Sequence, residues 1–168
     1  MARLILGIDP GTRITGFGLI EVQGDRMAHI RHGVIELGDV EALPLRLAVL
    51  ADAVADILRQ HQPQDFVLEK IFLGKNTDSA FKLGHARGVL MAEASRAQVP
   101  VTEYAARQVK KGVTGNGGAS KEEAQMVVQN LLRIGAIQRI DASDALALAC
   151  YHAFELQKKT LLRRAVEA

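Results

Sequence analysis

The sequence contains one cysteine, Cys150, and no apolar run that approaches the roughly 18 residues of a membrane-spanning helix. A single cysteine excludes an internal disulfide framework and a cysteine-rich zinc site. Because Cys150 lies in an Ala/Leu-rich stretch, we expect a small core residue rather than a reactive thiol. We also find no secretory signal, so we expect a cytoplasmic protein that does not associate with a membrane.

The net charge of the chain is also small, but the charged residues are unevenly distributed along it. The chain has 21 Lys and Arg against 19 Asp and Glu, which leaves a net charge of +2. That value alone does not indicate a polyanionic partner. Residues 105–121, however, contain no acid and four basic residues, namely Arg107, Lys110, Lys111 and Lys121.

Length and composition are those of one globular domain. The chain has 168 residues, 48% hydrophobic and 24% charged, and we find no internal repeat. This length is enough for a single hydrophobic core. We expect residues 1–157 to form the domain and residues 158–168 to form a frayed basic tail.

Two hydrophobic periodicities divide the chain. The first 38 residues alternate as strands do and contain short turns, which predicts a three-strand antiparallel meander. Later strand-like segments alternate with helical periodicity, which predicts right-handed crossovers and two parallel strands. The expected fold is therefore α/β, with a five-stranded mixed sheet flanked by helices. We expect strands at 3–9, 14–22, 27–37, 65–69 and 99–104, and helices at 43–61, 78–97, 120–134 and from about 141 past 152.

Local signals refine three of these boundaries. Asp78 is the expected N-cap of the second helix. Ser120 and Glu123 have the spacing of a capping box, which places the start of the third helix at Ser120. Residues 112–118 are rich in glycine and are expected to form a mobile loop.

Four acidic residues stand where the surrounding sequence predicts burial. Asp9 and Glu69 each end an apolar strand, and Asp141 and Asp144 open an Ala/Leu-rich helix. A buried carboxylate is costly unless a counter-ion offsets its desolvation. Strand carboxyl ends form the ligand-binding edge of an open α/β sheet, and residues three apart share one helix face. The four carboxylates can therefore converge on two divalent ions, for which oxygen ligands favour Mg²⁺ or Mn²⁺.

Each acid also has a purely structural interpretation. Asp9, which precedes Pro-Gly, could start an Asx turn, and Glu69 could be a charge on an edge strand. Asp141 and Asp144 could be first-turn acids favoured by the helix dipole. We favour the shared metal site because the structural interpretations would all have to hold together.

Five motifs, in order and at matching spacing, resemble the RuvC family of bacterial Holliday-junction resolvases. They cover nearly the whole chain and fail only after about residue 156. No position departs from the family's catalytic pattern. The matching segments are LGIDPGTRITG (6–16), LEKIF with KN (68–72 and 75–76), KLGHARG (82–88), EYAARQVK (103–110) and DASDALA (141–147).

This resemblance implies a ribonuclease-H-like fold and Mg²⁺-dependent nicking of two opposed strands at a four-way DNA junction, in recombination and repair. The expected products carry 5′-phosphate and 3′-hydroxyl ends. The family's catalytic, metal-binding acids correspond to Asp9, Glu69, Asp141 and Asp144, which would hold two Mg²⁺ ions per subunit, with Mn²⁺ able to substitute. The resemblance also implies a homodimer and cooperation with the RuvA–RuvB branch-migration complex.

Basic residues around the acids are the predicted phosphate contacts, since Lys and Arg supply most of the affinity for DNA. By resemblance, Lys110 and Lys121 contact DNA near the scissile phosphate, and Phe72 stacks on or wedges between bases. Solvated surface charge, and a core position for Phe72, are the alternatives. The predicted DNA-binding residues are Phe72, Lys75, Lys82, Arg87, Arg107, Lys110, Lys111 and Lys121.

Gly84 and Gly88 are four residues apart on the second predicted helix, and Ala92 follows one turn later. Small residues at this spacing allow another backbone to come close. They fit either packing against the sheet or a twofold dimer contact, and two opposed cuts require two active sites.

Three other functions fit parts of the sequence. An ATP-binding module of the actin/Hsp70/sugar-kinase superfamily has a similar Gly-Ile-Asp-x-Gly-Thr hairpin, but it needs two such domains and this length supplies one. Another ribonuclease-H-like nuclease could act on RNA-containing substrates. A catalytically silent junction-binding protein is disfavoured because all four acids are present.

Overall fold

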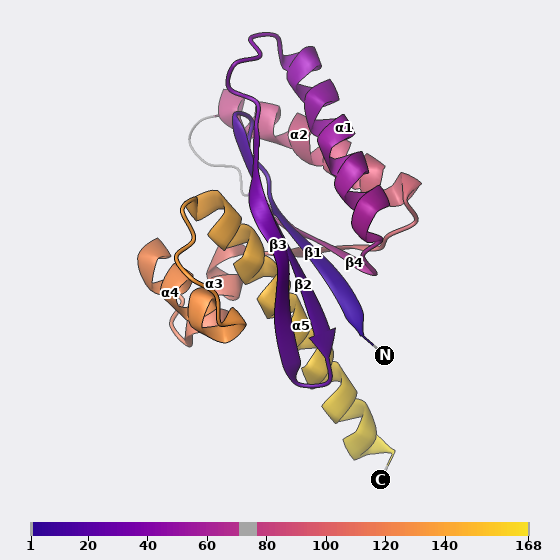
Figure 1. Ribbon diagram of the computed structural model, residues 1–168, viewed down its shortest axis with the longest axis vertical. Coiled ribbons are helices and arrows are strands. Elements are labelled where there is room, and N and C mark those ends of the chain that lie inside the picture. Colours follow the sequence, from indigo (N-terminus) through magenta and orange to yellow (C-terminus); the bar gives the residue numbers. More distant parts are fainter. Residues whose placement is uncertain (1, 71–76, 168) are drawn as a thin grey trace.

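The computed structural model of the protein describes residues 2–70 and 77–167. A five-stranded sheet lies at its centre, between two groups of helices (Figure 1). The strands are β1 (Arg3–Asp9), β2 (Ile14–Gln23), β3 (Arg26–Glu36), β4 (Asp65–Glu69) and β5 (Val101–Tyr104). The helices are α1 (Leu43–His61), α2 (Thr77–Arg96), α3 (Ala106–Thr114), α4 (Lys121–Leu132) and α5 (Ile140–Val166).

The strand order is β3-β2-β1-β4-β5. β1, β2 and β3 pair antiparallel, whereas β4 pairs parallel with both β1 and β5. The predicted meander with a two-strand parallel extension is therefore confirmed. The same order places β4 inside the sheet, so the interpretation of Glu69 as an edge-strand charge is wrong.

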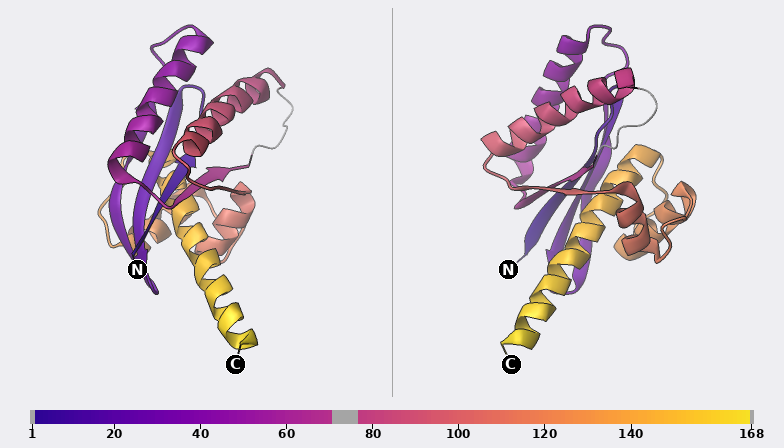
Figure 2. Two further views of the ribbon diagram at one scale, coloured as in Figure 1. Left: turned by 90° about the vertical axis from the view of Figure 1, so that its right-hand side faces the viewer. Right: turned by 180° about the vertical axis from the view of Figure 1, so that it is seen from behind.

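Both faces of the sheet are covered, as its near-continuous apolar strands require. Leu6, Ile8 and Phe66 pack with α1 and α2 on one face. Ile5 and Val67 pack with α3, α4 and α5 on the other. The views in Figure 2 show α5 running along this second face and extending beyond the sheet.

Helix α3 was not predicted, and its last residues lie in the segment that we expected to be a mobile loop. Val109 and Val113, one turn apart, are buried in the core of the α5 face. A Cβ at Gly112 would lie 2.1 Å from the ring of Tyr151 in α5. That glycine is therefore a packing residue, and the helix continues to Thr114, with Gly115 as its left-handed C-cap at a φ of 79°.

Other boundaries agree closely with the sequence. The capping box at Ser120 and Glu123 is present at the start of α4. Helix α2 begins at Thr77, so Asp78 lies in its first turn rather than at the cap. Residues 158–166, expected as a frayed tail, continue α5 as a helix. In the described ranges, no helix is long and apolar enough to cross a membrane.

Candidate active site

Asp9 and Glu69 lie side by side at the carboxyl ends of adjacent parallel strands. The register pairs Ile8 with Leu68, so the next residue of each strand is one of the two acids. Side chains alternate along a strand, which places Asp9 on the same side as Ile5, and Glu69 on the same side as Val67. That is the face covered by α5.

Glycines allow α5 to approach this face closely. A Cβ at Gly7 of β1 would lie 2.1 Å from the carbonyl oxygen of Ala145, and one at Gly16 of β2 would lie 2.0 Å from that of Asp141. Real Cβ atoms essentially never come this close to backbone, so only glycine fits. These contacts hold the first turns of α5, with Asp141 and Asp144, against the ends of β1 and β2.

Three of the four predicted acids and two of the predicted basic residues line one cavity of about 180 Å³. Asp9, Glu69 and Asp144 approach it from β1, β4 and α5. Lys110 and Lys121 approach it from α3 and α4. Asp141 lies one turn before Asp144 and is half-buried, but it does not line the cavity.

The acids interact electrostatically. Burial raises the pKa of Asp9 to about 7, together with the charges of Glu69, Asp144 and Asp141, whereas Lys121 opposes the shift. The pKa of Glu69 is also raised, first by burial and then by Asp144, against the effect of Lys121 and Lys110. The site therefore holds more negative charge than its own lysines neutralise.

One of the acids is already engaged. Lys121 Nζ donates to Asp144 Oδ2 at 2.6 Å, which raises the pKa of Lys121. Among residues 2–70 and 77–167, no three His, Cys, Asp or Glu side chains are gathered closely enough to hold a metal ion. The donor set nevertheless fits a hard cation, since it consists of carboxylate oxygens with unbalanced negative charge in a partly buried pocket. A divalent ion would bring the carboxylates together by offsetting their repulsion.

The other predicted DNA-binding residues are in varied surroundings. Arg107 and Lys111 are exposed on α3 and line a neighbouring surface depression with Gln108. Lys82 pairs with Asp78 on the surface of α2 at 2.6 Å. Arg87 is half-buried and forms an ion pair with Glu103 of β5. This ion pair joins α2 to the sheet. Phe72 and Lys75 lie outside the described residues.

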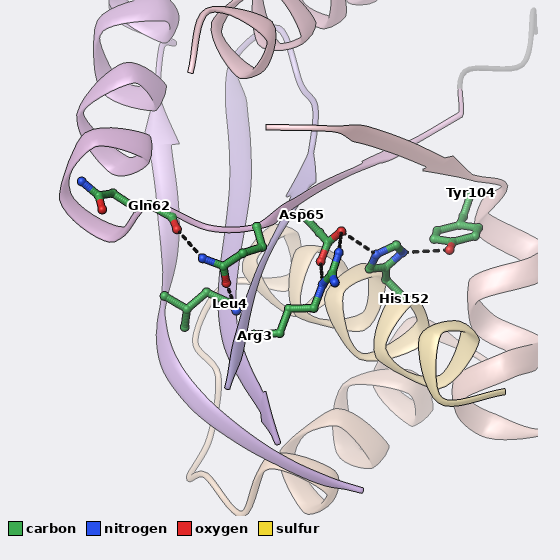
Figure 3. A network of polar contacts seen from close by, with 7 residues as sticks. Arg3, Leu4, Gln62, Asp65, Tyr104 and His152 are labelled. Atoms are coloured by element: carbon green, nitrogen blue, oxygen red, sulfur yellow. Dashed lines mark hydrogen bonds and ion pairs between the residues drawn. The ribbon is translucent and has the colours of Figure 1, made fainter. Parts of the chain in front are cut away.

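A partly buried polar network at the opposite end of β4 from Glu69 was not predicted (Figure 3). Asp65, at the start of β4, accepts hydrogen bonds from Arg3 of β1, one of them from Nη2 at 2.8 Å. His152 of α5 places Nε2 3.4 Å from Asp65 Oδ1, and its Nδ1 lies 2.9 Å from the hydroxyl of Tyr104. Burial favours the neutral form of Asp65, but Arg3 and His152 outweigh it and lower its pKa to about 2.

This network joins β1, β4 and α5, the elements that carry the four acids. Asp144, Leu148 and His152 follow at four-residue intervals, so they share one face of α5. That spacing was the signal available in the sequence. It could not identify Asp65 and Arg3 as partners, because their pairing depends on the parallel register of β1 and β4.

Known proteins match this chain over most of its length. The model of the family described as Crossover junction endodeoxyribonuclease RuvC matches residues 5–152. A protein of that name from Bdellovibrio bacteriovorus is 57% identical over 166 residues, with 99% of each chain covered. Another, from Shewanella sp. strain MR-4, is 47% identical over 149 residues, covering 89% of this chain and 86% of the relative.

Solved structures agree. The structure described as Thermus thermophilus RuvC in complex with Holliday junction substrate superposes with a TM-score of 0.88 at 30% identity, covering 94% of this chain and 97% of the other. A second structure of RuvC from the same organism gives a TM-score of 0.85 over the same shares of the two chains. The predicted ribonuclease-H-like fold is thereby confirmed. This chain belongs to the RuvC family of crossover junction endodeoxyribonucleases.

Proposed function

We propose that this protein resolves four-way DNA junctions by nicking two opposed strands through divalent-metal-dependent hydrolysis. The observation that carries the proposal is the cavity shared by Asp9, Glu69, Asp144, Lys110 and Lys121 in a chain of this family. The Thermus thermophilus relative described with a Holliday junction substrate supports the choice of DNA. The products would carry 5′-phosphate and 3′-hydroxyl ends.

The proposed metal site consists of all four acids. Asp9, Glu69, Asp141 and Asp144 would hold two Mg²⁺ ions, with Mn²⁺ able to substitute. When bound, such a pair supplies an activated water and stabilises the leaving oxygen of the phosphodiester. Because burial and the neighbouring acids raise the pKa of Asp9 to about 7, its carboxyl group must lose its proton before it can act as a ligand.

The basic residues would bind and orient the phosphate. Lys110 and Lys121 line the cavity, so their ammonium groups can face a phosphate seated over the acids. Arg107 and Lys111, exposed on α3, extend the positive charge along one approach to the cavity. Lys82 and Lys75 would contact phosphates farther along the DNA, and Phe72 would stack on bases. The pairing of Arg87 with Glu103 makes Arg87 the weakest of the predicted DNA contacts.

We propose that two copies of the chain associate through α2. Phe81 is 71% exposed there, beside a surface cavity of about 600 Å³. An added Cβ at Gly84 or Gly88 would meet no atom within 4 Å, so these glycines do not pack against the sheet. The face is apolar and accessible, as a twofold interface requires. Its lining residues are Leu47, Ala80, Phe81, Gly84, His85, Gly88, Val89 and Ala92.

The proposed working context is the cytoplasm, with RuvA–RuvB delivering junctions to the dimer. Residues 158–166, the helical extension of α5, carry four basic residues and no acid. This composition suits contact with a nucleic acid or an acidic partner surface. Residues 1–157 would form the nuclease domain proper.

A synthetic four-way junction incubated with the protein and Mg²⁺ tests the proposal. We expect paired, symmetric nicks on the junction and none on a linear duplex or an RNA–DNA hybrid. Asp9→Asn should abolish cleavage while junction binding survives, because this change removes no phosphate contact. Asp52→Asn, an exposed acid of α1, is the matched control and should cut normally.

Near-normal cleavage by Asp9→Asn would disprove the metal site. Cleavage of the hybrid in preference to the junction would replace the proposed substrate with an RNA-containing one. Phe72→Ala should lose junction resolution without losing stability, and unaltered resolution would return Phe72 to a structural role.

A further inference from the structure

Lys121 forms an ion pair with a carboxylate that the proposed metal site requires. It is the first residue of α4, and the capping box at Ser120 holds the start of that helix in place. From this position its ammonium donates to Asp144 Oδ2 at 2.6 Å, inside the cavity that Asp9 and Glu69 also line. The ammonium group therefore places a positive charge where the proposed site would hold its metal ion.

The two partners of this ion pair differ in exposure. The Lys121 side chain is 57% exposed, whereas that of Asp144 is 22% exposed. The lysine therefore has room to turn its head group into solvent once its hydrogen bond to Asp144 is broken, while Asp144 stays fixed on α5.

The second lysine of the cavity provides a contrast. Lys110 Nζ donates to the backbone oxygen of Ala119 at 3.1 Å and forms no ion pair with a described acid. Its charge acts on Glu69 only through space. Of the two, Lys121 alone competes directly for a proposed metal ligand among the described residues.

We propose that Lys121 is a positioning residue that competes with the metal: it neutralises Asp144 when no metal is bound and releases this carboxylate when metal and DNA arrive. This inference rests on the proposed metal site. The released ammonium would pair with a DNA phosphate over the cavity. Bound DNA would thus draw Lys121 away from Asp144, so that metal and DNA would each favour the binding of the other. Coupling of this kind is reciprocal. It would keep the free protein poorly loaded with metal and restrict hydrolysis to bound DNA.

The test measures Mn²⁺ binding to the full-length protein without DNA, by calorimetry and by electron paramagnetic resonance. Lys121→Met keeps the length of the side chain and removes the competing charge, and we expect Mn²⁺ to bind about tenfold more tightly, the scale of one charged hydrogen bond. Lys121→Arg restores a cation that can pair with Asp144 and should return the affinity toward that of the unaltered protein.

Lys111→Met is the matched control. It removes the same charge from exposed Lys111 of α3, which does not line the cavity, and should change Mn²⁺ affinity less than about twofold. Equal effects of Lys121→Met and Lys111→Met on Mn²⁺ affinity would show that both changes act through general electrostatics. That result would overturn the proposed competition between Lys121 and the metal. Unchanged affinity in Lys121→Met would overturn it as well.

Asp9→Asn and Asp144→Asn separate this inference from the proposed function. If both weaken Mn²⁺ binding while Lys121→Met has no effect, the metal site stands and the competing role of Lys121 is wrong. If neither weakens Mn²⁺ binding, the metal site itself is wrong and the inference fails with it.

Discussion

Asp9 and Asp65 are carboxylates on the same face of the sheet, yet their pKa values move in opposite directions. Asp9 has acidic neighbours, and its pKa is raised to about 7. Asp65 has Arg3 and His152 as partners, and its pKa is lowered to about 2 despite its burial. The charged form of Asp9 is therefore destabilised, as we would expect of a ligand in the proposed metal site, whereas the charged form of Asp65 is stabilised by its partners within the fold.

Asp9→Asn should stabilise the metal-free protein. The folded-state pKa of Asp9 lies above the ordinary aspartate value of 3.8, so stability falls as pH rises from about 4 to about 7. Asparagine removes this penalty, and we expect a gain of about 2–4 kcal/mol at pH 7.5 that vanishes near pH 4. Urea denaturation in EDTA at both pH values measures it. Asp52→Asn should show no such gain, and a loss of stability in Asp9→Asn at pH 7.5 would contradict the prediction.

Asp65→Asn should destabilise the protein. The folded-state pKa of Asp65 is about 2, below the ordinary aspartate value of 3.8, so its contribution to stability is present above pH 4 and is lost as pH falls toward 2. We expect a loss of about 2 kcal/mol at pH 7, shrinking toward zero near pH 2. Denaturant titrations across this range would detect it. A loss that does not depend on pH would show that packing, rather than charge, explains the role of Asp65.

At the scale of elements, the contact of α5 with β1 and β2 positions the site. The helix crosses Gly7 and Gly16 with no space for a side chain, and its first turns carry two of the proposed metal ligands. The 27-residue length of α5 then carries His152 to the network with Asp65. Helix α5 thus contributes both to the proposed metal site and to the polar network with Asp65.

Gly16→Ala should displace the start of α5. The added methyl would meet the Asp141 carbonyl at 2.0 Å, and this backbone cannot move without shifting the helix. We expect a loss of about 3 kcal/mol in stability together with weaker Mn²⁺ binding. Thermal unfolding and calorimetry measure the two effects. Gly38→Ala, where nothing lies within 4 Å, is the control; equal behaviour of the two variants would contradict the role of Gly16.

At the scale of the whole molecule, the proposed cavity and the proposed dimer face belong to different layers. The acids face the α5 side of the sheet, while the exposed apolar face of α2 lies in the layer on the opposite side. In the proposed dimer, this arrangement would leave the cavity of each copy free for its own DNA strand. The ion pair between Arg87 and Glu103 joins α2 to β5. The next residue of β5, Tyr104, pairs in register with Glu69 of β4.

Gly84→Glu should convert the proposed dimer to monomers. The position is open, so the fold should tolerate the change, while a carboxylate in the apolar interface would be left without a partner. Sedimentation velocity at micromolar concentration should show one-half of the original mass. Met126→Glu changes an exposed apolar residue of α4 outside the α2 face and should leave the dimer intact. Dimers that persist in Gly84→Glu would place the interface elsewhere.

Local patterns were sufficient to predict the strands and most of the helices. Residues 43–61 repeat with helical periodicity and 65–69 form a short apolar run, and both segments were predicted with their observed bounds. Helix α3 was missed because nine residues ending near several glycines look like a loop. Its two buried valines and the contact of Gly112 with Tyr151 become evident only when α5 is in place.

The sequence by itself determined where the carboxylates fall, since Asp9 and Glu69 end apolar strands and Asp141 and Asp144 share a helix turn. These are consequences of strand and helix periods, which act over a few residues. Tertiary structure decided which charges meet. The pairing of Lys121 with Asp144 and of Arg3 with Asp65 joins residues far apart in the chain. Such pairs depend on the packing of whole elements, because coulombic partners are set by distance in space rather than along the chain.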